Sequence, residues 1–144
     1  MKRLLFILLL FSFSFAQDPG WGEDFQNEPL NNEYSATIAA AQVWINGVEQ
    51  SGGQLAAFGE DGIISAWDGN GASYFPPADT YTYELSVLSN SLSGEVMTFK
   101  FYDDVHDLII DLNETYEFVV GDMVGDPFNP FQLTGTVPIY GCTD

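Results

Sequence analysis

Short segments in which apolar and polar residues alternate make up most of the chain after residue 33. In the clearest, YTYELSV at 81–87, two tyrosines, a leucine and a valine alternate with polar residues. Successive side chains of a β-strand point to opposite faces, so this pattern predicts a strand with one buried face and one wetted face. Clusters of Gly, Asn, Asp and Pro separate the segments. We predict strands near residues 34–45, 54–59, 63–67, 80–88, 95–102, 108–112, 115–120 and 131–137.

Further apolar rows with the same period complete a predicted core. The residues expected to face inward in these rows are Met97, Phe99, Phe101, Leu108, Ile110, Leu112, Tyr116, Phe118 and Val120. Asn46-Gly47 and Asp61-Gly62 are dipeptides that favour tight hairpins. Because no segment has a sustained helical period, about eight strands in residues 34–137 predict one all-β domain. We expect an antiparallel β-sandwich of immunoglobulin-like or jelly-roll-like type.

The N-terminus has the features of an export signal. Lys2 and Arg3 precede an apolar run over residues 4–11, and Ser14 and Ala16 stand where a signal peptidase reads small residues. The apolar run is shorter than the roughly 20 residues of a membrane-spanning helix. We therefore predict a signal peptide over residues 1–16 and a secreted or cell-surface location, with no membrane insertion after cleavage. Residues 17–33 are expected to form an extended lead-in.

The charge balance excludes several classes of partner. The chain has 21 acidic and 3 basic residues, a formal net charge of −18. Loss of Lys2 and Arg3 with the signal would leave Lys100 as the only base. Nucleic acids and anionic membrane surfaces need clustered basic residues, so neither is expected as a partner. With 46% hydrophobic residues the chain is too apolar for a disordered acidic tail, and cations are its natural partners.

Few catalytic sets can be assembled from these residues. His106 is the only histidine, and Cys142, near the end, is the only cysteine. An internal disulfide is excluded, and neither a Cys-His pair nor a histidine-rich zinc site is expected. There is no Gly-x-Ser-x-Gly elbow, while paired carboxylates for glycoside hydrolysis stay open because acids are abundant. We expect a non-enzyme and assign no catalytic or cofactor-binding residue.

Four segments resemble a β-sandwich module of large secreted or cell-surface proteins of marine Bacteroidetes-like bacteria. They are INGVEQ at 45–50, QLAAFGEDG at 54–62, YTYELSVLSNSLSGEVMTFKFYDD at 81–104 and GDPFNPFQLT at 125–134. The resemblance implies a β-sandwich and an extracellular location associated with type IX secretion, more than any activity. Relatives often carry an Arg-Gly pair after the acidic turn, whereas this chain has Ile-Ile-Ser-Ala at 63–66. No role of that arginine is carried over.

The ending YGCTD at 140–144 is similar to the opening of acidic repeats that begin Gly-Cys-Thr-Asp and follow such modules. This resemblance implies that the chain is part of a longer polypeptide. Residues 138–144 are then a linker or the start of the following repeat.

An acidic run is the first candidate binding site. Asp103, Asp104, Asp107 and Asp111 lie close in sequence, with His106 and Glu114 nearby. Calcium prefers six to eight oxygen ligands, which a loop between strands can supply. The run lacks EF-hand spacing, so a solvated turn is the alternative.

Aromatic residues are the second candidate. Trp67, Tyr74 and Phe75 lie in or beside the loop DGNGASYFPPADT, where sugar rings could stack on them, and Trp21 and Trp44 could extend the platform. The alternative is that these rings close the core.

Three functions follow for such a module. A structural or adhesive role, with an extracellular protein or polysaccharide as partner, leads. A carbohydrate-binding module, calcium-stabilised or not, comes second, and an enzyme third.

Overall fold

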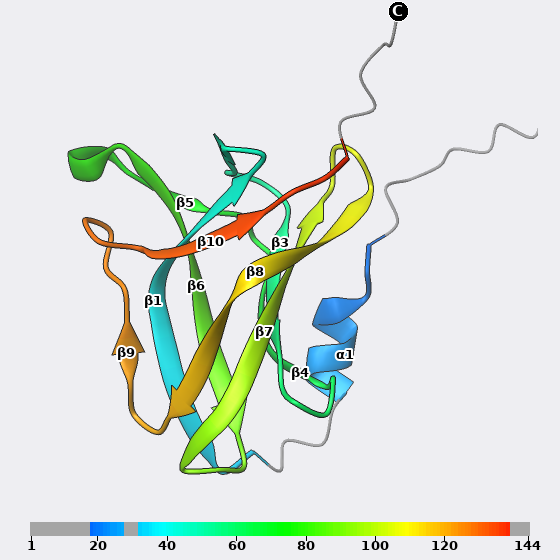
Figure 1. The fold of residues 1–144 in the computed structure, drawn as a ribbon, viewed down its shortest axis with the longest axis vertical. Helices are drawn as coiled ribbons and strands as arrows, with labels where there is room; N and C mark the ends of the chain where they lie inside the picture. The colour runs from blue at the N-terminus through cyan, green and yellow to red at the C-terminus, as the bar shows by residue number, and fades with distance from the viewer. Residues whose placement is uncertain (1–17, 28–31, 139–144) are drawn as a thin grey trace, which may run out of the picture.

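Two β-sheets pack face to face in the computed structural model, which describes residues 18–27 and 32–138 (Figure 1). The larger sheet contains β1 (Tyr34–Ile45), β2 (Val48–Glu49), β5 (Ser73–Phe75), β6 (Thr80–Ser89), β9 (Met123–Val124) and β10 (Phe131–Gly135). The smaller sheet contains β3 (Gln54–Phe58), β4 (Ile64–Asp68), β7 (Ser93–Asp103) and β8 (Leu108–Val119), in the order β4-β3-β7-β8. A short 3₁₀ turn, η1 (Pro76–Ala78), joins β5 to β6. The predicted all-β sandwich is confirmed.

Strand β1 organises the larger sheet. It pairs antiparallel with β6 and β2, and parallel with β9 and β10. The parallel pairing of β1 with β9 and β10 was not predicted, because alternation along a strand carries no information on the direction of its neighbour. The register with β6 shifts between Ile38 and Ala41. This bulge moves the inward side from the even positions Ala36 and Ile38 to the odd positions that follow.

The main hydrophobic core lies between the two sheets, as the alternation predicted. The predicted inward residues that are buried are Tyr83, Leu85, Val87, Met97, Phe99, Phe101, Ile110, Leu112, Tyr116 and Phe118. The predictions for Leu108 and Val120 are wrong, because these side chains are 43% and 42% exposed. Tyr81 is only half-buried. These three lie at or beyond strand ends, where the opposite sheet no longer covers an inward side chain.

The predicted lead-in is not fully extended, because Trp21–Asn27 forms helix α1. The indole of Trp21, 5% exposed, packs edge-on against Phe58 and Tyr102 at centroid distances of 5.8 and 6.5 Å. A second hydrophobic cluster thus forms beneath α1. The helix itself lies beside the smaller sheet (Figure 1). An isolated helix of seven residues is unstable in water, so this burial stabilises α1 rather than helix propensity.

The strands predicted at 108–112 and 115–120 are one strand, β8. Glu114 lies half-buried at the inward position between Leu112 and Tyr116, so the period of two that begins at Ile110 continues through this segment. The short strands β2, β5 and β9 were not predicted, whereas the other predicted strands are confirmed to within a few residues.

Both predicted hairpin dipeptides form turns. Asn46 and Gly47 adopt φ of +50° and +78° between β1 and β2, as a tight hairpin turn requires. Gly62 has φ of +79° between β3 and β4, and the Asp61 carboxylate accepts a hydrogen bond from the N–H of Ile63 at 2.9 Å.

Some predictions fall outside the described residues: the signal peptide 1–16, Cys142, and residues 139–144 of the predicted linker. Across residues 18–27 and 32–138, no helix has the length and apolar character needed to cross a bilayer.

Candidate functional site

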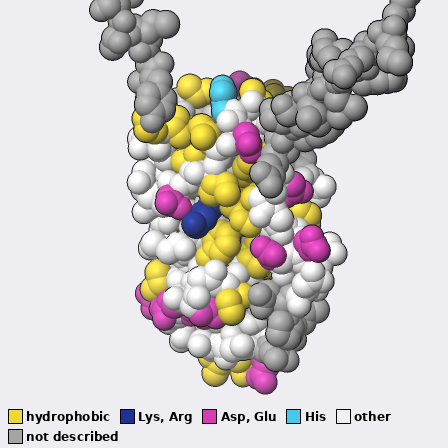
Figure 2. Space-filling view, turned by 90° about the vertical axis from the view of Figure 1, so that its right-hand side faces the viewer, with side chains coloured by type: hydrophobic (Ala, Val, Ile, Leu, Met, Phe, Trp, Pro, Cys, Tyr) yellow, Lys and Arg dark blue, Asp and Glu magenta, His cyan; other side chains and the backbone are white. Residues whose placement is uncertain are grey.

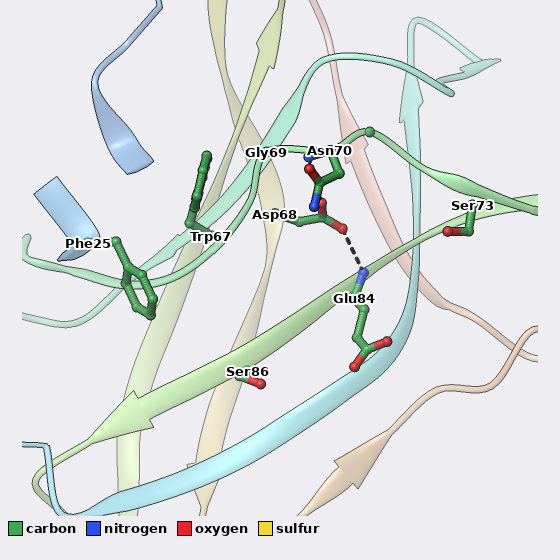
Figure 3. Close-up of a pocket in the computed structure, with 9 residues that line it drawn as sticks. Phe25, Trp67, Asp68, Gly69, Asn70, Ser73, Glu84 and Ser86 are labelled. Carbon is green, nitrogen blue, oxygen red and sulfur yellow. Dashed lines mark hydrogen bonds between the residues drawn. The ribbon is translucent and has the colours of Figure 1, made fainter. Parts of the chain in front are cut away.

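A pocket of about 380 Å³ opens where the two sheets come together along β4 and β6 (Figure 3). β4 is the last strand of the smaller sheet, and β6 pairs with β5 only over Thr80–Thr82. Beyond Thr82, the edge of β6 faces the edge of β4. The residues that line the pocket are Phe25, Trp67, Asp68, Gly69, Asn70, Gly71, Ser73, Glu84 and Ser86.

Asp68 joins the two sheets at this pocket. Its carboxylate accepts a hydrogen bond from the backbone N–H of Glu84 on β6 at 3.0 Å and another from the N–H of Asn70 at 3.0 Å (Figure 3). One carboxylate therefore holds both the β6 edge and the loop after β4. Charge-assisted bonds of this kind are among the stronger ones in proteins.

Trp67 forms much of the apolar side of the pocket. Its six-membered ring lies against the backbone of Gly22 in α1 and of Gly69, and a Cβ at residue 22 would come within 2.6 Å of the ring. The indole N–H donates to the Gln54 side chain at 2.8 Å. The ring is thus fixed in a half-buried position, between the two alternatives that the sequence left open.

The polar side of the pocket is exposed. The side chains of Asn70, Ser73, Glu84 and Ser86 are all solvent-accessible, and Phe25 and Trp67 stand across from them (Figure 3). Amide, hydroxyl and carboxylate groups beside aromatic rings can bind hydroxyl-bearing ligands, with the rings packing on apolar C–H surface.

Tyr74 and Phe75 do not line this pocket. Tyr74 is 50% exposed and stacks against Tyr81 at 4.9 Å, whereas Phe75 packs edge-on against Phe128 at 5.2 Å. The two residues are neighbours on β5, so they point to opposite faces. The structure therefore separates Trp67 from Tyr74 and Phe75.

The other two tryptophans do not extend a platform around Trp67. Trp21 is buried under α1. Trp44 lies on β1, where its N–H donates to the Gln132 side chain at 2.6 Å.

The acidic run is spread over several interactions. Asp103 accepts from the N–H of Val105 at 3.0 Å, and its second oxygen lies 2.7 Å from Nδ1 of His106. Asp103 therefore stabilises the β7–β8 turn.

The other three acids lie in different surroundings. Asp107 accepts a hydrogen bond from the Tyr102 hydroxyl at 2.9 Å, and Asp111 pairs with Lys100 at 3.4 Å. Asp104 is exposed. In the described part of the chain, no three His, Cys, Asp or Glu side chains gather in a way that could hold a metal ion. The calcium site stays a prediction.

Sequence reasoning missed most of the pocket. Asp68, Asn70 and Glu84 were not singled out, although Glu84 lies on the polar face of a predicted strand and Asp68-Gly69-Asn70-Gly71 is a turn-like sequence after Trp67. These signals are common on any surface. They become a site only when β4 and β6 lie side by side.

In comparisons with known proteins, no family model, no curated protein and no solved structure matches this chain.

Proposed function

We propose that this chain is a non-catalytic, exported β-sandwich module that binds a carbohydrate in the pocket between β4 and β6. The observation that carries the proposal is the composition of the pocket. Two aromatic side chains, Phe25 and Trp67, stand across from exposed amide, hydroxyl and carboxylate groups. Such a surface matches a sugar, which has apolar C–H faces and hydroxyls around its rim.

The surroundings of the pocket support binding rather than catalysis. The Asp68 carboxylate accepts two backbone N–H groups and so serves the fold. His106, the only histidine of the chain, is paired with Asp103 in the β7–β8 turn and does not line the pocket.

A glycan array probed with the purified exported chain tests this function, once with calcium and once with a chelator. We expect specific binding that the Glu84→Ala variant loses by about ten- to a hundredfold, as for a lost hydrogen bond to a charged group. Glu117→Ala is the matched control, because Glu117 is an exposed acid on β8, at the other edge of the smaller sheet. If a folded sample binds no glycan on the array, the proposal is wrong.

A structural or adhesive role is the second candidate, and one observation favours it. Phe128 is 65% exposed and Tyr74 is 50% exposed, so aromatic surface projects from β5 and from the loop before β10. Exposed aromatic side chains are frequent at protein interfaces. Loss of binding to an extracellular protein in Phe128→Ser, but not in Glu84→Ala, would favour this role.

A further inference from the structure

We infer that the sugar bound in this pocket carries a free, protonated amino group. The inference rests on the proposed carbohydrate function and specifies its ligand class. It starts from the charges that line the cavity. Asp68 and Glu84 both contribute carboxylates, and none of the described residues that line the pocket is a lysine or arginine. Lys100, the only base beyond residue 3, lies on β7 and pairs with Asp111.

Two backbone donors at the pocket are already used. The N–H groups of Asn70 and Glu84 are the kind of donors that would bind a carboxylate or sulfate of an anionic sugar. Both donate to the Asp68 carboxylate instead. An anionic sugar would meet two negative charges and find these donors occupied, so uronic acids and sulfated glycans are disfavoured.

The aromatic side of the pocket favours a cation as well. An ammonium group over an aromatic face gains about 0.5–2 kcal/mol from the ring quadrupole. Phe25 and Trp67 stand across the pocket from Glu84 (Figure 3). A sugar with an amino substituent can pack its C–H face on a ring and place the ammonium group beside a carboxylate. A neutral sugar can pack on the ring but has no ammonium group to place beside the carboxylate.

The whole molecule adds to this preference. On the face that Figure 2 shows, acidic side chains lie at several separate places, with hydrophobic side chains between them. A formal net charge of −18 produces a field that concentrates cations near the protein and repels anionic polymers.

Calorimetry with three matched oligosaccharides tests the inference. Oligomers of glucosamine, N-acetylglucosamine and glucose share one linkage and differ only in bearing an ammonium, an acetamide or a hydroxyl group. We expect the glucosamine oligomer to bind about tenfold tighter than the glucose oligomer, as a single charge pair near water would give. Glu84→Gln keeps hydrogen-bonding capacity and removes the charge, so it should abolish this preference while neutral binding remains. Glu117→Gln should retain the preference.

The outcomes separate the inference from the function on which it rests. Equal binding of all three oligomers, or a preference that persists in Glu84→Gln, overturns the amino-sugar inference and leaves the carbohydrate function standing. If no oligomer binds in calorimetry and no glycan binds on the array, both the amino-sugar inference and the carbohydrate function are overturned. Binding of a lysine oligomer alone, lost in Glu84→Gln, assigns the pocket to a basic peptide and also overturns the inference.

Discussion

Three buried tyrosines donate their hydroxyl protons to oxygen atoms that the folded chain brings within reach. Tyr83 donates to the carbonyl of Gly52 at 2.6 Å, and Tyr102 and Tyr116 donate to Asp107 and Asp122, each at 2.9 Å. Burial, followed by the hydrogen bond to Asp107 and the charges of nearby carboxylates, raises the pKa of Tyr102 to about 12. Burial also raises the pKa values of Tyr83 and Tyr116. The fold therefore stabilises the neutral form of these tyrosines.

Stability should fall in alkali as a result. A group whose pKa is raised by folding stabilises the protein fully below its unfolded pKa, which is about 10 for tyrosine. That contribution is lost as pH rises from about 10 through the folded value of about 12. We expect the free energy of unfolding to decrease over this range, with a smaller decrease in Tyr102→Phe. Denaturant titrations at several pH values measure it. An identical pH dependence in both proteins would contradict the role of Tyr102.

At the scale of elements, α1 and the two open sides of the sandwich depend on a few side chains. Trp21 attaches α1 beside the smaller sheet, and Gly22 and Gly69 leave room for Trp67 beneath it. Asp68 joins β4 to β6 on one open side. On the other, the Glu114 carboxylate accepts from both the N–H and the hydroxyl of Thr134 on β10, at 2.6 and 2.5 Å. On each open side, a carboxylate of the smaller sheet thus accepts a hydrogen bond from a backbone N–H of the larger sheet.

Replacement of Trp21 should detach α1. We expect Trp21→Ala to lower the free energy of unfolding by about 3 kcal/mol, because a large, nearly fully buried side chain is removed. Gln26→Ala, at an exposed position of the same helix, should change it by less than about 0.5 kcal/mol. Chemical denaturation followed by tryptophan fluorescence compares the two. Equal stabilities would mean that the indole does not hold the helix.

Loss of the Glu114 charge should loosen the edge of β10. Glu114→Gln replaces one acceptor oxygen with a donor that faces Thr134, so we expect a loss of about 1–3 kcal/mol. Glu117→Gln on the same strand lies at an exposed position and should have little effect. Hydrogen exchange of the Thr134 amide gives a local readout. Unchanged protection in Glu114→Gln would show that the carboxylate is not needed there.

At the scale of the whole molecule, charge repulsion should dominate the response to salt. With 21 acids and few bases, the folded state brings like charges together, and ions screen them. We expect Tm to rise between about 0.01 M and 1 M sodium chloride, as the screening length falls from about 30 Å to about 3 Å. Differential scanning calorimetry measures this rise. A Tm that is constant or falls with salt would contradict it.

The same scans test the predicted calcium site. Screening depends on ionic strength, whereas a specific site saturates and stabilises the fold according to its own affinity. Calcium chloride should then raise Tm more than sodium chloride at matched ionic strength, and Asp107→Asn should remove the excess. The same Tm in both salts would count against the site.

The sequence by itself determined the class of fold and most of the core, because alternation with a period of two records which face of each strand is buried. Most strands and buried residues such as Phe99 and Phe118 follow from that rule, whereas the two hairpin turns follow from their Asn-Gly and Asp-Gly dipeptides. Trp67 was identified as a candidate binding residue because it is an aromatic residue beside a polar loop. The two halves of β8 were predicted as separate strands, and the inward position between Leu112 and Tyr116 holds a charged residue, Glu114, whose partner Thr134 lies on β10.

Only the tertiary structure decided the direction of β9 and β10, the attachment of α1 and the composition of the pocket. Asp68 and Glu84 lie on different strands of different sheets, and a side chain's own segment does not specify which distant strand edge it will meet. For the same reason, Tyr74 and Phe75, close to Trp67 in sequence, lie outside its pocket. Local periodicity determines which side of a strand is buried, whereas a binding site depends on which strands the packing of the sheets brings together.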